Sequence, residues 1–325
     1  MLISTIINKS IVQGIPLLFG STGEIITEKS GNLNLGIPGI MYVGGSTGIL
    51  GAYLYEKYAA VPSPFWCIVI PLVSAILGSG LLALLYSFLT VTLHANQNVT
   101  GLAITTFGTG FGDFFGGSIT KIFGEGGNLS VKTTADYFKT TLPFANSLGD
   151  FGKIFFSYGF LVYLAIIIAI VAAIVLKKTR VGLHLRAVGE NPATADAAGI
   201  NVTKYKYLAT CIGGIVAGFG GLYFIMDYTG GSWTNGGFGD RGWLAIALVI
   251  FALWRPNLGI IGSFIFGGLY IAYSYVSGLS RASIAIFNML PYIVTIVVLI
   301  ITSMRNKKEN QPPQSLGLSY FREER

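Results

Sequence analysis

Long apolar stretches, separated by short polar breaks, run through most of the 325-residue chain. A helix needs about 20 predominantly apolar residues to cross a bilayer. The stretches that fit or approach this length have the bounds 4–27, 33–55, 65–90, 98–120, 155–176, 207–226, 242–254, 257–280 and 283–304. The pattern predicts an all-α, polytopic integral membrane protein with about nine transmembrane helices, within a range of eight to ten.

Two of these stretches depart from a simple span. Residues 33–55 contain Asn34, Pro38 and several glycines, so we expect a bent or discontinuous helix there. Irregular backbone at membrane depth persists only when it is buried in protein or lines a wet cavity. Residues 33–45 are therefore a candidate wall of a pathway. Residues 242–254 are short for a crossing, so that helix is expected to begin in the preceding loop or to stop part-way.

Three polar regions divide the apolar pattern. Residues 121–155 are rich in Lys and Gly and are predicted to form an extracytoplasmic loop. Residues 177–206 form a second long polar segment between two spans. Residues 305–325 are a polar tail, predicted to be cytoplasmic and frayed. The prediction is one transmembrane domain over residues 1–304, followed by this tail.

The second polar segment contains its own helix signals at residues 186–201. Asn191 suits an N-cap, Pro192 suits the first helical position, and Gly199 can adopt the left-handed conformation that ends a helix. About two turns lie between them, and Asp196 is their one charge. A helix this short is marginal alone in water. Two interpretations are open: a docking helix offered to a partner, or a surface loop with no partner.

Composition and charge support the membrane interpretation. The chain is 52% hydrophobic and 11% charged, with a mean hydropathy of +0.66, whereas soluble domains carry about 25% charged residues. The net charge of +7 does not indicate nucleic-acid binding, because the basic residues lie in the connecting loops. If residues 177–206 and the tail are cytoplasmic, that side holds 13 Lys and Arg against 8 on the other. This bias has the sign expected for cytoplasmic loops.

The sequence offers no catalytic motif. There is no P-loop or HExxH, and the two cysteines form no CxxC metal site. We therefore expect no enzyme activity, no metal and no cofactor, so any ATP must be hydrolysed by another polypeptide. Glu24 and Asp113 lie near span ends and are candidates for carrying a coupling ion. A secondary transporter that works alone would also need an internal repeat, which is not clear here.

Several motifs in order carry a family resemblance. The run from Glu24 to Met41 resembles a signature of the membrane subunits of ribose/nucleoside-type ABC importers. Arg186–Pro192 with Ala197–Asn201 is similar to that family's cytoplasmic coupling segment. Arg241–Phe251 with Trp254–Pro256, and Pro291–Thr295, resemble later spans. The version of the first motif is similar to those of nucleoside importers, although Lys29 and Pro38 depart from the usual residues.

The resemblance implies a permease of the cell (cytoplasmic or inner) membrane that works with ABC ATPase subunits. It also implies a second, related permease subunit and an extracytoplasmic binding protein that delivers a small-molecule substrate. A short cytoplasmic helix at 191–199 would dock on the ATPase and transmit its motion. The residues expected to carry this coupling are Gly189, Glu190, Asn191, Pro192, Ala195, Asp196, Ala198 and Gly199.

The substrate is the least determined part of the prediction. A nucleoside is neutral and rich in hydroxyls, so amides and hydroxyls near breaks in the spans suit its pathway. Asn34, Asn98 and Thr100 are the candidates, with helix capping or bridging as the alternative for each. A simple sugar such as ribose or galactose is the alternative substrate, and an ion-coupled secondary transporter is the alternative class.

Overall fold

The computed structural model describes residues 2–124, 128–143, 145–276, 278, 280–305 and 311–322. Residues 125–127 and 144 of the predicted 121–155 loop, and 306–310 and 323–325 of the tail, lie outside this range. The long helices are α1 (Leu2–Glu28), α2 (Ile37–Tyr58), α3 (Pro64–Ser87), α4 (Gln97–Ile122), α7 (Phe160–Lys178), α10 (Val202–Tyr223), α12 (Pro256–Ile271) and α13 (Arg281–Arg305). The shorter helices are α5 (Lys132–Phe138), α6 (Gly149–Phe155), α8 (Arg180–Glu190), α9 (Pro192–Ala197) and α11 (Arg241–Phe251).

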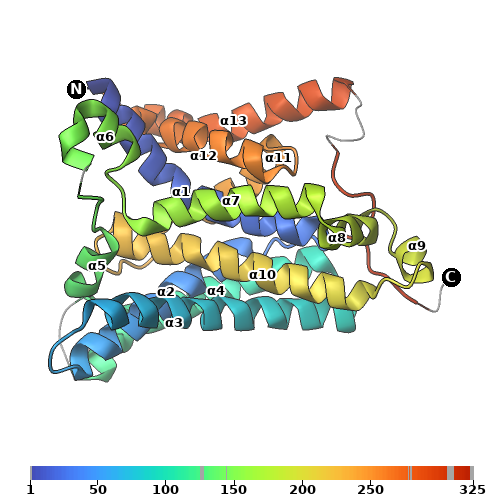
Figure 1. Cartoon of the computed structure of the whole chain (residues 1–325), viewed down its shortest axis with the longest axis horizontal. Helices are drawn as coiled ribbons and strands as arrows, with labels where there is room; N and C mark the ends of the chain where they lie inside the picture. Colours follow the sequence, from blue (N-terminus) through green and yellow to red (C-terminus); the bar gives the residue numbers. More distant parts are fainter. Residues whose placement is uncertain are drawn as a thin grey trace.

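The described residues confirm the all-α prediction, since their one β-feature is an isolated bridge between Ser130 and Ser232. The long helices run side by side along one direction of the molecule (Figure 1). Helices α5 and α6 lie at one end of this bundle, and α8 and α9 lie at the other. We refer to these as the α5–α6 end and the α8–α9 end.

Five of the described helices are long and apolar enough to cross a membrane: Pro64–Thr92, Phe160–Lys178, Val202–Tyr228, Pro256–Tyr275 and Ser283–Ile301. These bounds include short π-helical or 3-10 extensions of α3, α10 and α12. Helices α1, α2 and α4, of 27, 22 and 26 residues, have the length of a crossing but are less apolar. Helix α11 has only 11 residues, in line with the expected short segment at 242–254.

Helix α2 differs from the expected bent segment. Only Leu33–Gly36 is non-helical, and the helix continues unbroken from Ile37 to Tyr58. Pro38 lies in the first turn, where its missing N–H removes no intrahelical bond. The glycines instead allow neighbouring backbones to approach: a Cβ on Gly44 would lie 2.5 Å from the Cα of Gly218 in α10. Close packing, not a break, explains the glycine content of α2.

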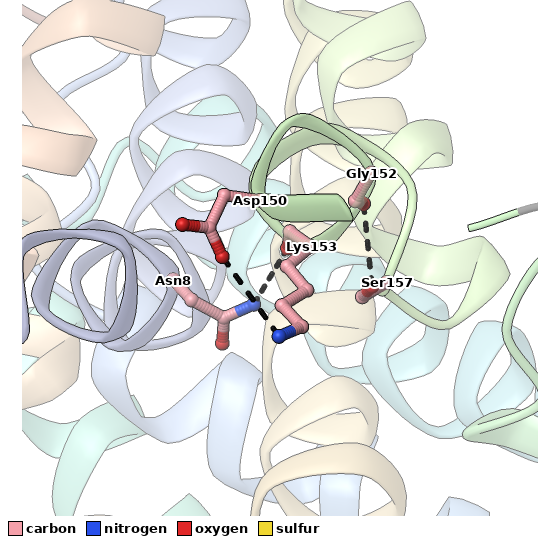
Figure 2. A network of polar contacts seen from close by, with 5 residues as sticks. All are labelled: Asn8, Asp150, Gly152, Lys153 and Ser157. Atoms are coloured by element: carbon pink, nitrogen blue, oxygen red, sulfur yellow. Dashed lines mark hydrogen bonds and ion pairs between the residues drawn. The ribbon is translucent and has the colours of Figure 1, made fainter. Parts of the chain in front are cut away.

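Helix α6 is attached to the first helix at the α5–α6 end. The Asn8 side chain of α1 donates a hydrogen bond to the Lys153 carbonyl oxygen over 3.1 Å (Figure 2). The Lys153 ammonium lies 3.8 Å from the Asp150 carboxylate, and the Ser157 hydroxyl donates to the Gly152 carbonyl oxygen over 3.2 Å. Part of the polar 121–155 region is thus helical and packed on the bundle.

Candidate functional site

The helix predicted within residues 191–199 is present as α9, and its end signals are confirmed. The Asn191 side-chain oxygen accepts a hydrogen bond from the Thr194 N–H over 3.0 Å. Pro192 is the first helical residue, and Gly199 has a φ of +83°. A positive φ is readily adopted by glycine and disfavours residues with a Cβ. The six residues of α9 are therefore delimited on both sides by local chemistry.

The residues before α9 form a second helix, α8, within the polar segment 177–206. The Thr179 hydroxyl caps it by accepting from the Gly182 N–H over 3.1 Å. Its buried positions are Gly182, Leu185, Val188 and Gly189, a spacing of three to four that fits one helical face. This periodicity and the Thr179 cap are signals in the sequence from which the helix could have been predicted.

Helix α9 rests on one buried contact and exposes small residues elsewhere. Ala195 is buried against Val188 of α8 and Val202 of α10. Ala193, Thr194, Ala197, Ala198 and Gly199 are exposed. Small exposed side chains let another backbone approach closely, so this face suits contact with a second protein.

The predicted coupling residues are distributed between this exposed face and its support. Asn191, Ala198 and Gly199 are exposed, as is Glu190 at the end of α8. Gly189 is buried, and a Cβ there would lie 2.4 Å from the Lys29 carbonyl oxygen. Gly189 therefore joins α8 to the turn between α1 and α2. Their role in coupling stays a prediction.

The C-terminal segment 311–322 packs against this region, contrary to the expected frayed tail. Both the backbone N–H and the hydroxyl of Ser315 donate to the Gly189 carbonyl oxygen, over 3.0 and 2.6 Å. The Gly317 N–H donates to the Gly31 carbonyl oxygen over 3.3 Å. Leu316 packs beside a buried cluster that includes Ile25 and Trp254.

The end of the C-terminal segment reaches α9 itself. The Tyr320 hydroxyl donates to Asp196 Oδ2 over 2.9 Å, and Arg322 Nε lies 3.3 Å from the same oxygen. The rings of Phe321 and His94, with centroids 4.4 Å apart and planes inclined by 36°, extend the contact to the turn before α4. The polar composition of the tail gives no signal of this packing, because each contact depends on a partner distant in sequence.

Two buried carboxylates organise the turn between α1 and α2. Glu24 Oε1 accepts from the Asn34 N–H over 3.0 Å, and the Glu28 carboxylate accepts from the Trp254 indole N–H. Lys29 follows directly, and burial lowers the pKa of its ammonium, an effect that the nearby Glu190 carboxylate opposes. The run from Glu24 to Asn34 thus fixes the shape of the turn on which Gly189 and Gly31 meet the C-terminal segment.

The predicted pathway residues do not converge. Asn34 is fully buried, and its side-chain oxygen accepts from the Gly36 N–H over 2.9 Å. Thr100 is buried on the inner face of α4, whereas Asn98 is exposed at the start of the same helix. The geometry of Asn34 is that of a turn-forming side chain. Of the three, Asn98 is the one open to the surroundings of this chain.

Helix α4 exposes further small and polar residues beyond Asn98. Ala103, Thr106 and Gly110 are exposed along it, and a Cβ on Gly110 would meet nothing within 4 Å. Further along, the half-buried Asp113 carboxylate accepts from the Tyr42 hydroxyl and, over 3.2 Å, from the Gly236 N–H. Val99, Leu102 and Phe107 are exposed on the same helix, so its outer surface mixes large apolar side chains with small and polar ones.

The fold is a helical bundle in which several apolar helices have the length of a membrane crossing. A folded polar segment lies at one end, and together these features indicate a multi-pass membrane protein. The family comparison identifies its class as a permease. Residues 6–299 match the family described as "Branched-chain amino acid transport system / permease component". The chain belongs to this family of permease components.

Curated relatives match over nearly the whole chain. The nucleoside ABC transporter permease protein NupC of Lactococcus lactis subsp. cremoris is 30% identical, over 90% of each chain. The guanosine ABC transporter permease protein NupQ of Bacillus subtilis is 29% identical, over 100% of this chain and 98% of its own. The putative glucose ABC transporter permease protein TsgC13 of Haloferax volcanii is 31% identical, over 98% of each. No solved structure matches this chain.

Proposed function

We propose that this chain is the permease subunit of an ABC importer for nucleosides in the cell (cytoplasmic or inner) membrane. The observation that carries the proposal is the similarity, over 90% or more of the chain, to relatives named as nucleoside and guanosine ABC transporter permeases. ATP hydrolysis then belongs to separate ATPase subunits. An extracytoplasmic solute-binding protein and a second, related permease subunit complete the importer.

In this proposal the α8–α9 end faces the cytoplasm and the α5–α6 end faces outwards. The long helices α1, α2, α3, α4, α7, α10, α12 and α13, together with the short α11, give about nine crossings. This orientation places the coupling segment 177–206 and the tail on the side with more Lys and Arg, as the positive-inside bias requires.

Coupling follows from the position of α9 between two spans. Helix α7 enters the segment through α8, and α10 leaves it at Val202. Closure of the ATPase around its nucleotide would move α9, and the rigid caps at Asn191 and Gly199 would pass that motion to α7 and α10. Such a transition needs two discrete positions of α9 that nucleotide binding favours differently.

Uptake in cells tests the substrate class directly. We expect a strain lacking this chain to lose import of labelled guanosine or adenosine, with import restored by the gene on a plasmid. Labelled glucose and ribose are tested as alternative substrates, because the relative named as a putative glucose permease is equally similar. Loss of sugar import with unchanged nucleoside import would reject nucleosides and establish the sugar alternative.

A further inference from the structure

A cavity of about 730 Å³ lies beside α9 at the α8–α9 end. It is bounded by the π-helical turn Phe88–Thr92 that extends α3, by the turn from α9 into α10, and by the end of the C-terminal segment. This volume is in the range of small-molecule sites. Asp196 and Gly199 of the predicted coupling helix help to line it, but the coupling mechanism assigns it no ligand.

A buried lysine lines this cavity without a partner. Lys206, in the second turn of α10, is 3% exposed. Among the described residues, neither a carboxylate nor a hydrogen-bond acceptor pairs with its ammonium. The residue is buried, but its ammonium opens onto the cavity and has no counter-charge beside it. An anion in the cavity would supply the missing interaction.

The other charged groups of the cavity are also mainly cationic. Among its described lining residues, Lys204 and Arg322 join Lys206, and Asp196 is the one carboxylate. That carboxylate already accepts from Tyr320 and lies 3.3 Å from Arg322. Thr203 also lines the cavity. The excess of positive charge and donors fits an oxyanion.

We propose that this cavity binds a phosphate group, with Lys206 as its principal ligand. The cytoplasmic ends of α3 and α10 would lie at the level of lipid headgroups, so the phosphate can come from an acidic phospholipid or from a soluble phosphate compound. The bound phosphate would join α3, α10 and the C-terminal segment beside α9. This site is independent of which substrate the permease carries.

Thermal unfolding of the purified chain in detergent tests the proposal without relying on transport. The probes are inorganic phosphate against chloride at matched ionic strength, and phosphatidylglycerol against phosphatidylcholine. We expect one of the two phosphate probes to raise the midpoint by about 2–5 °C at saturation. A response to inorganic phosphate identifies a soluble ligand, and a response to phosphatidylglycerol alone identifies a headgroup.

Three variants assign the effect to the cavity. Lys206→Met should raise the phosphate concentration needed for half-saturation at least 10-fold, and Lys206→Arg should preserve the response. Lys121→Met removes an exposed lysine in the last turn of α4, outside the residues that line the cavity, and should respond as the unaltered chain does. The site does not exist if neither probe stabilises the unaltered chain, or if Lys206→Met responds normally. A different role follows if the unaltered chain shows no phosphate response and Lys206→Met no longer co-purifies with an ATPase subunit. Lys206 would then belong to the ATPase contact.

Discussion

The backbone at Gly199 decides whether α9 keeps a defined end. Its φ of +83° lies in the left-handed region, and a Cβ there would meet nothing within 4 Å, so conformation and not space limits substitution. Proline fixes φ near −65°, whereas asparagine tolerates the left-handed region. We expect Gly199→Pro to abolish nucleoside uptake and Gly199→Asn to keep most of it, at equal amounts in the membrane.

Equal uptake by both Gly199 variants would show that the end of α9 does not need its present conformation. Immunoblots of the membrane fraction separate this result from a loss of protein. The cap at the other end is expected to have a smaller effect, since replacing an N-cap Asn with Ala costs about 1 kcal/mol.

Two neighbouring glycines of α4 test the packing between α2 and α4. A Cβ on Gly108 would lie 2.5 Å from the Gly39 carbonyl oxygen, whereas one on Gly110 would meet nothing. Gly108→Ala should therefore destabilise the chain by about 1–3 kcal/mol, as overpacking does, and lower its thermal unfolding midpoint in detergent. Gly110→Ala is the matched control and should leave the midpoint within about 1 °C. Similar midpoints for the two variants would contradict the close packing of α2 on α4.

At the scale of the elements, the C-terminal segment 311–322 adds hydrogen bonds that help to hold α8 and α9 on the bundle. It bonds to Gly189 in α8, to Gly31 in the α1–α2 turn and to Asp196 in α9. Removal of residues 311–325 should speed hydrogen exchange of the amides in 180–199 at least 10-fold and lower uptake. Removal of 323–325 alone is the control and should change neither. Unaltered exchange in the longer truncation would show that α8 and α9 are held without the tail.

Some of the elements could be predicted from the sequence alone, and others could not. The apolar stretches predicted the all-α bundle, because burial in lipid leaves a long, direct signal, and the caps of α9 were readable from Asn191, Pro192 and Gly199. The unbroken course of α2 was not predicted, since its glycines act through contacts with α4 and α10 that only the fold creates. For the same reason, the buried roles of Asn34 and Thr100 and the packing of the tail could not be predicted.

For the whole molecule, the account depends on α9 being the part of the permease that meets the ATPase. A photo-crosslinking amino acid at Ala197, which is exposed on α9, tests this contact in cells that carry the complete importer. The same amino acid at Lys139, beside α5 at the opposite end of the bundle, is the control. The account predicts an ATPase cross-link from position 197 and none from position 139. An ATPase cross-link from position 139, or attachment of position 197 only to extracytoplasmic proteins, would contradict it.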